Sequence, residues 1–233
     1  MPDLPVAELV VFVHGLWLTG QECALLRRRL AREFGFDVRT FRYPTVSAPM
    51  AEITQRLERF VQQLPAAAPL HWVGHSLGGL VIHRFLERHP CALRERPPGR
   101  VVFLGTPAVA SRAALRAGRV RLLAALMGRC VAEELLIEQP RRWASAQPLG
   151  IIAGSRAMGL GRLFAGFAEP NDGTVAVSET RLPGASAHLT LPVSHMGMLL
   201  SARVARATGT FLREGHFGSV RGAQPRSSSA RNR

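Results

Sequence analysis

The sequence predicts an α/β fold: a doubly wound, mostly parallel sheet of about six strands with helices on both faces. Three observations predict it. Apolar runs of strand length recur along the chain, helical patterns separate them, and 233 residues suffice for one sizeable domain of this kind but not comfortably for two. Strands that alternate with helices are joined by crossovers, so they run parallel and their carboxyl ends meet at one edge of the sheet.

The individual elements follow from the same patterns. The predicted strands are 8–13, 37–42, 70–74, 100–104, 149–154 and 187–193. The predicted helices are 19–34, 50–64, 76–89, one or more within 110–146, and 196–213. Residues 1–214 are expected to form a single domain. Residues 215–233 consist mainly of Gly, Ser, Arg, Pro and Gln, a composition that predicts a disordered basic tail.

The segment 108–147 is the unusual part of this domain. Alanine, leucine and arginine dominate it, which favours helix. One interpretation is a helical lid over the strand ends, with Arg112, Arg116 and Arg119 forming a weak basic face toward an anionic membrane surface. The equally weighted alternative is a pair of ordinary helices packed on the sheet.

Charge and cysteine content limit the choice of partners and compartment. The formal charge is +14 and all 30 basic residues are arginines, but they are dispersed and lack interleaved aromatic residues, so no nucleic acid partner is expected. The three cysteines, Cys23, Cys91 and Cys130, form neither a disulfide framework nor a metal-binding spacing. With no signal peptide and no apolar stretch of membrane-spanning length, a cytoplasmic location is expected.

The strongest chemical signal is Gly74-His75-Ser76-Leu77-Gly78, which directly follows a predicted strand and opens a predicted helix. G-x-S-x-G in this context is typical of a nucleophile elbow, in which a sharp turn exposes the serine above the sheet. Small residues on either side allow the strand and the helix to approach closely. Ser76 is therefore the candidate nucleophile.

A serine nucleophile needs a base and a carboxylate that orients the base, and in this fold the order along the chain is Ser, acid, His. Asp172 is the only aspartate after Ser76 and lies in a loop by composition, with Glu169 as the fallback acid. His195 follows the last predicted strand directly, a position from which an imidazole can reach the serine. The other histidines considered lie in predicted helices, inside or at the start of a strand, or in the tail.

The oxyanion hole requires two backbone N–H donors. Leu77, directly after the nucleophile, is expected to supply one of them. Leu16 is expected to supply the other, because the first strand runs straight into His14-Gly15-Leu16-Trp17. Trp17 borders this position and is expected to shape the acyl pocket, whereas His14 is interpreted as a structural residue of the loop.

At these motifs the chain resembles the α/β-hydrolase family, specifically its small lipase- and esterase-like members. The stretches that carry the resemblance lie within residues 8–213 and are 13–17, 74–79, 104–107, 171–175 and 194–199. Compared with that family's sheet, the six predicted strands form a reduced α/β-hydrolase fold that lacks the usual antiparallel first strands. The resemblance implies ester hydrolysis by a serine triad with no metal or organic cofactor.

The function expected from the sequence is therefore a serine ester hydrolase acting on a small-molecule or lipid ester, with an apolar acyl group. One alternative uses the same three residues to transfer the acyl group to an alcohol or thiol. The other alternative is a non-catalytic binding protein with a hydrolase fold, which the basic charge suggests and the intact set of motifs opposes. The sequence favours neither a particular acyl chain nor an oligomeric state.

Overall fold

The computed structural model of the chain describes residues 7–108, 134, 141–158 and 169–218. Within these residues six strands form one parallel sheet in the order β2-β1-β3-β4-β5-β6. The strands are β1 (Leu9–Val13), β2 (Asp37–Phe41), β3 (Leu70–His75), β4 (Pro98–Leu104), β5 (Leu149–Gly154) and β6 (Ala187–Leu191). The predicted parallel sheet of six strands is confirmed, and all six strand carboxyl ends lie at the same edge.

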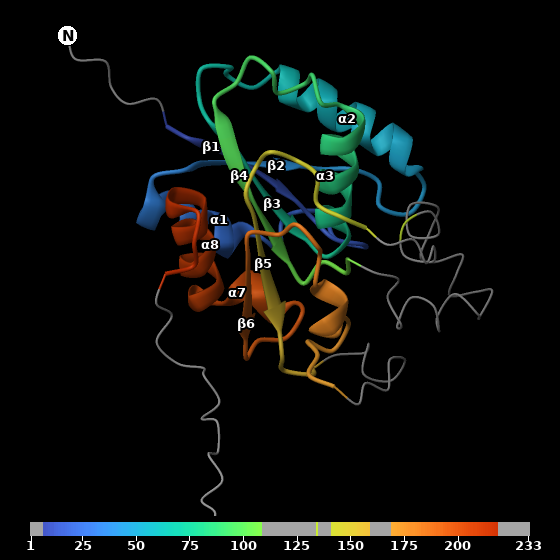
Figure 1. Cartoon of the computed structure of the whole chain (residues 1–233), viewed down its shortest axis with the longest axis vertical. Helices are drawn as coiled ribbons and strands as arrows, with labels where there is room; N and C mark the ends of the chain where they lie inside the picture. The colour runs from blue at the N-terminus through green and yellow to red at the C-terminus, as the bar shows by residue number, and fades with distance from the viewer. Residues whose placement is uncertain (1–6, 109–133, 135–140, 159–168, 219–233) are drawn as a thin grey trace, which may run out of the picture.

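Helices cover both faces of this sheet (Figure 1). They are α1 (Ala24–Phe34), α2 (Met50–Gln62), α3 (Leu77–Arg88), α7 (Gly197–Leu200) and α8 (Ala202–Glu214), with a 3-10 turn η1 at Ser178–Thr180. Helices α2 and α3 pack on one face, and α1, α7 and α8 pack on the other. The predicted doubly wound arrangement is therefore confirmed for the described residues.

Strand β1 shows how the sequence builds the two layers. Val11 and Val13 join the core beneath α2 and α3, while Val10 and Phe12 join the core beneath α1 and α8. Because both faces of a central parallel strand are covered, its sequence is continuously apolar and does not alternate. All five residues of β1 are buried.

Two helices differ most from their predicted bounds, each for a local reason, whereas α2 and α3 differ by at most two residues at either end. The first helix begins at Ala24 instead of residue 19, since the Glu22 carboxylate accepts hydrogen bonds from the backbone N–H groups of Thr19 and Gly20 and holds them in a turn. The last predicted helix is divided at Ser201, whose backbone is extended. The Ser201 hydroxyl accepts a hydrogen bond from Val204 N and thereby caps α8.

Most of the predicted lid segment 108–147 lies outside the described residues. Its described residues include Glu134, which is buried and whose carboxylate accepts hydrogen bonds from Arg84 at 2.8 Å and Arg141 at 3.1 Å. Arg141 also donates to Ala108 O. These contacts link the two ends of the segment to each other through Arg141, and Glu134 links them to α3; the lid itself stays a prediction.

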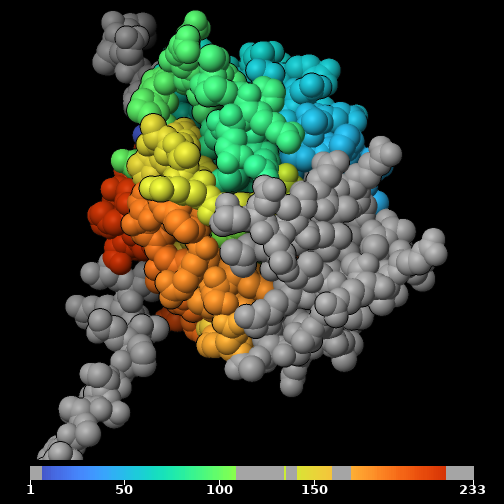
Figure 2. Space-filling view, turned by 45° about the vertical axis from the view of Figure 1, so that its right-hand side comes forward, coloured from blue at the N-terminus to red at the C-terminus, as the bar shows by residue number. Residues whose placement is uncertain are grey.

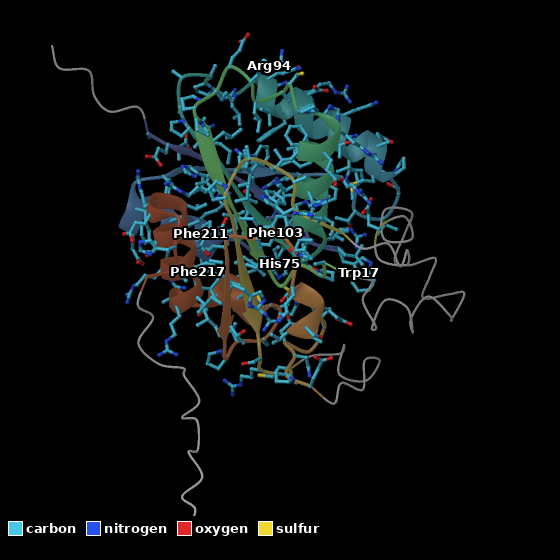
Figure 3. All side chains as sticks on the ribbon, in the orientation of Figure 1. Trp17, His75, Arg94, Phe103, Phe211 and Phe217 are labelled. Atoms are coloured by element: carbon cyan, nitrogen blue, oxygen red, sulfur yellow. The ribbon has the colours of Figure 1, made fainter. Side chains whose placement is uncertain are left out.

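The predicted tail from residue 215 is described only as far as residue 218. Gly215 ends α8 in a left-handed conformation, and the Phe217 ring lies 4.9 Å from that of Phe211, beside the sheet (Figure 3). Packing thus continues for three residues past the predicted end of the domain, to Phe217. None of the helices in the described part of the chain combines the length and apolarity that a bilayer crossing requires.

Candidate active site

Ser76 lies at the junction of β3 and α3, where the chain reverses direction at the carboxyl edge of the sheet. Its backbone has φ 53° and ψ −123°, a region that non-glycine residues rarely occupy and that costs about 1–3 kcal/mol. Ser76 precedes the first residue of α3, yet its side chain makes no capping hydrogen bond to that helix. The serine predicted as the nucleophile therefore occupies a strained turn, with a hydroxyl that is not used to cap the helix.

Three glycines make this turn sterically accessible. A Cβ atom added at Gly74 would meet the backbone of Gly79 across the turn. One added at Gly78 would overlap the carbonyl oxygen of Val13 in β1, and one added at Gly79 would overlap the Thr106 side chain. The elbow thus depends on direct backbone approach between β3, α3 and β1, which only residues without a Cβ allow.

Asp172 and His195 form a buried pair at the carboxyl ends of β5 and β6. Asp172 Oδ2 lies 2.7 Å from His195 Nδ1, and His195 N donates to Asp172 O at 2.9 Å. Asp172 Oδ1 accepts further hydrogen bonds from the backbone N–H groups of Thr174 and Val175. The carboxylate is therefore held by its own loop with one oxygen directed at the imidazole, which then carries its proton on Nδ1.

Glu169, the fallback acid, is placed differently. Its backbone carbonyl accepts a hydrogen bond from Asn171 Nδ2, and Asn171 Oδ1 in turn accepts from Gly173 N. These bonds shape the loop that presents Asp172. Of the two candidate acids, it is Asp172 that the structure brings to His195.

The loop after β1 closes over the elbow. A Cβ atom at Gly15 would lie 3.1 Å from Ser76 Cβ, so the next residue, Leu16, starts directly beside the serine. Trp17 N donates to Thr45 Oγ1, and Trp17 itself has φ 59° and a 64% exposed surface. Leu16 and Leu77 therefore lie on either side of Ser76, from two different elements.

His14 supports this loop from below. Its Nδ1 lies 3.1 Å from Gly15 O and its Nε2 accepts from Tyr43 N, while the Tyr43 hydroxyl donates to His14 O at 2.7 Å. The two rings stack with centroids 4.5 Å apart. Burial lowers the pKa of His14, so the ring stays neutral at physiological pH. These contacts match the structural role expected for His14.

Sequence reasoning missed three residues that shape this site. Gly105, in a left-handed conformation with φ 56°, faces the acid–histidine pair: an added Cβ would lie 3.0 Å from Asp172 Oδ2 and 3.1 Å from His195 Nδ1. His75 lies next to Ser76 and contacts the His195 ring and backbone. Thr45 anchors the loop after β1. A strand-ending glycine at 105 was a visible signal, whereas His75 and Thr45 carry none in their local sequence.

Other features of the described chain lie apart from this site. A cavity of about 560 Å³ is lined by the last turns of α3, Arg94 and residues 143–147, near the amino ends of β4 and β5. In Figure 3, Arg94 lies at the top of the molecule and His75 near its middle. In the space-filling view, residues 141–158 (yellow) lie between the loop after α3 (green) and residues 169–200 (orange) (Figure 2). The described residues contain no cluster of three or more His, Cys, Asp or Glu side chains able to hold a metal ion.

The family follows from the match of sequence to fold. The sequence profile of the alpha/beta hydrolase family matches residues 10–217, which include all six strands except the first residue of β1, and Ser76, Asp172 and His195. The chain belongs to the alpha/beta hydrolase family. A comparison with curated protein sequences returns no match.

Solved structures of low sequence identity share the fold. The phospholipase PlaB from Legionella pneumophila, in complex with thio-NAD, is similar with a TM-score of 0.65 and 16% identity over 87% of this chain and 56% of PlaB. The metagenomic carboxyl esterase MGS0156 has a TM-score of 0.60 and 18% identity over 82% of this chain and 65% of its own. The RedJ thioesterase of the prodiginine pathway in Streptomyces coelicolor has a TM-score of 0.60 and 16% identity over 88% and 91%.

These likenesses concern the fold. The chain spans little more than half of PlaB and about two thirds of the carboxyl esterase, so both larger proteins contain parts that have no counterpart here. RedJ is matched over nearly its whole length. The fold hosts many activities, and the reaction must be argued from the site.

Proposed function

We propose that the protein is a serine hydrolase of carboxylic esters, with Ser76 as nucleophile, His195 as general base and Asp172 as the residue that orients the base. The observation that carries the proposal is the 2.7 Å hydrogen bond between Asp172 Oδ2 and His195 Nδ1, at the same sheet edge as the strained turn at Ser76. A carboxylate bound to Nδ1 leaves Nε2 as the proton acceptor. This is the tautomer that a serine base requires.

The reaction proceeds in two halves. His195 Nε2 takes the hydroxyl proton while Ser76 Oγ attacks the ester carbonyl, and the resulting imidazolium gives that proton to the leaving alcohol. The acyl group is then bound to Ser76 Oγ. A water molecule attacks this ester with His195 again as base, and the product acid leaves while Ser76 regains its proton. Asp172 remains ionised and stabilises the imidazolium in both halves.

The N–H groups of Leu16 and Leu77 are proposed to hold the oxyanion. Leu77 is the first residue of α3, where the helix dipole adds favourable positive potential. Leu16 follows Gly15, whose backbone packs against Ser76. Each such donor contributes about 3 kcal/mol to transition-state stabilisation.

An apolar acyl group fits the surface around these residues. Trp17 is 64% exposed beside the oxyanion loop, and Met196 is 44% exposed next to His195. A phospholipase, a carboxyl esterase and a thioesterase are among the structures that share the fold, which is consistent with an acyl substrate. The proposed chemistry uses only side-chain and backbone groups of this chain, without a metal or organic cofactor.

The test is hydrolysis of p-nitrophenyl esters of increasing chain length by wild type, Ser76→Ala and Ser201→Ala. Ser201 serves as the matched control because it caps α8 away from the elbow. We expect Ser76→Ala to lower kcat by about 10⁶-fold and Ser201→Ala to retain the wild-type rate. A fluorophosphonate should label wild type at Ser76, and equal activity of wild type and Ser76→Ala would exclude the proposal. Product analysis with an added alcohol separates hydrolysis from acyl transfer.

A further inference from the structure

His75 is the residue before the proposed nucleophile, and it directly contacts the loop that carries the proposed base. Its side chain is 1% exposed and lies at the carboxyl end of β3 (Figure 3). His75 Nε2 lies 3.1 Å from His195 O, and the two rings are 4.7 Å apart between centroids. On its other side, a Cβ atom at Gly15 would lie 3.2 Å from His75 Nδ1. The ring thus lies between the oxyanion loop and the base.

These contacts determine the tautomer of His75. A carbonyl oxygen only accepts hydrogen bonds, so Nε2 carries the proton and donates it to His195 O. Nδ1 is then an unprotonated acceptor, buried and without a hydrogen-bond partner among the described residues. Protonation at Nδ1 would place a second, unpaired charge in this buried position.

The surroundings keep His75 neutral. The titratable groups that act on it are His195, Asp172 and His14. Complete burial, and after it the charge that His195 would carry, lower the pKa of His75 from 6.5 to about 3. His75 therefore remains an uncharged donor while His195 becomes an imidazolium during the proposed reaction.

His195 is held at three points. Its backbone N–H and its ring Nδ1 both bind Asp172, and its carbonyl oxygen binds His75. The two bonds to Asp172 fix the base relative to the acid. The bond to His75 fixes it relative to the nucleophile, since His75 and Ser76 are consecutive residues of the elbow.

We infer that His75 is a positioning residue that aligns the base with the nucleophile by donating a hydrogen bond from the elbow to the backbone carbonyl of His195. This inference rests on the proposed function. Because a displacement of about 1 Å can cost about 10²-fold in rate, loss of this bond should lower kcat without weakening substrate binding.

The experiment compares four variants of the full chain with wild type. His75→Phe keeps an aromatic ring but loses the hydrogen-bond donor. His75→Gln places its side-chain N–H about as far from the backbone as His75 Nε2, so it can still donate to His195 O. The shorter side chain of His75→Asn places its N–H too close to the backbone to reach that oxygen. His71→Phe is the matched control, because His71 is a buried histidine at the other end of β3 that binds Arg100 N and Glu8. The measurements are kcat and KM for p-nitrophenyl butyrate, the rate of fluorophosphonate labelling, and the melting temperature.

We expect His75→Phe and His75→Asn to lower kcat and the labelling rate by about 10- to 100-fold with KM unchanged. His75→Gln should recover most of that loss. His71→Phe should lower the melting temperature and leave kcat of the folded protein unchanged. If His75→Phe does not fold, the comparison of His75→Gln with His75→Asn gives the same test.

Equal kcat in His75→Gln and His75→Asn would overturn the inference, as would a loss confined to KM or to the melting temperature. Failure of the proposed function gives a different result, because wild type itself would then neither hydrolyse the ester nor react with the fluorophosphonate.

Discussion

The two halves of the candidate site are held together by opposite means. At the elbow, Gly74, Gly78 and Gly79 provide the geometry by lacking side chains, so that strand and helix backbones touch. At the other half, Asp172 and His195 are held by hydrogen bonds to each other and to the backbone. The elbow should therefore be sensitive to added atoms, and the acid–histidine pair to lost polarity or charge.

Within this comparison, the largest expected effect comes from neutralising the acid. Asp172→Asn leaves the side-chain volume nearly unchanged. Its amide oxygen would keep the hydrogen bonds from Thr174 N and Val175 N, so its NH2 group would face His195 Nδ1, donate a hydrogen bond to it and favour the wrong tautomer. We expect kcat to fall by about 10⁴-fold, with little change in the melting temperature. Glu169→Gln is the control and should retain activity. Full activity of Asp172→Asn would show that the negative charge of Asp172 is not needed to orient His195.

The next largest effect is expected at the elbow. Gly78→Ala would place a Cβ against the carbonyl oxygen of Val13 in β1, so β1 and α3 must separate. We expect a loss of about 3 kcal/mol or more in the free energy of unfolding, measured by urea denaturation. A variant with wild-type stability would contradict the view that the elbow depends on direct backbone contact.

Lower pH should reduce the free energy of unfolding through His75, which lies where the elbow contacts the acid–histidine pair. His75 has an ordinary pKa near 6.5 when unfolded and about 3 when folded. Between these values the unfolded chain binds more protons, so stability falls as the pH is lowered from 6.5 toward 3. The expected slope from His75 alone is roughly 1 kcal/mol per pH unit.

Urea denaturation at pH 7.5, 6 and 5 measures this slope. Burial also lowers the pKa of His14 and His188, so part of the acid sensitivity should remain in His75→Gln. The variant should nevertheless show a shallower dependence than wild type. An identical slope in both proteins would mean that His75 does not contribute.

The smallest effect is expected at Gly105, where a missing side chain and the hydrogen-bonded acid–histidine pair meet at one residue. Gly105→Ala would add a methyl group 3.0 Å from Asp172 Oδ2 and 3.1 Å from His195 Nδ1, in a left-handed backbone. We expect about 10-fold lower kcat from a displacement of a few tenths of an ångström. Gly35→Ala is the control for backbone strain alone, because its φ is 71° and the nearest atom to an added Cβ is 3.8 Å away. Equal kcat in the two variants would show that the contact at Gly105 is irrelevant.

The sequence predicted the elements whose signals are local. Short apolar or alternating runs marked the six strands, and Ser76 and His195 were recognisable because each follows a predicted strand. The break at Ser201 and the turn at residues 19–22 were missed, since both depend on single side chains that bind nearby backbone groups in place of helix.

The contacts across the site could not be predicted in the same way. His75 and His195 are 120 residues apart in the chain, and only the strand order β3-β4-β5-β6 brings them together. Gly105 was visible as part of a strand-ending motif, but its position against Asp172 and His195 depends on the register of three strands. Long-range packing of this kind leaves no periodicity in the sequence.

The strand order also has a consequence for heat inactivation. Among the described residues, β6 is the outermost strand on its side and pairs only with β5. His195 follows β6, whereas Ser76 follows the central strand β3. Peripheral strands open in sub-global fluctuations at a lower free energy than the centre of a sheet. On warming, turnover should therefore cease while most of the secondary structure persists, because fraying at the periphery removes the imidazole before the interior melts.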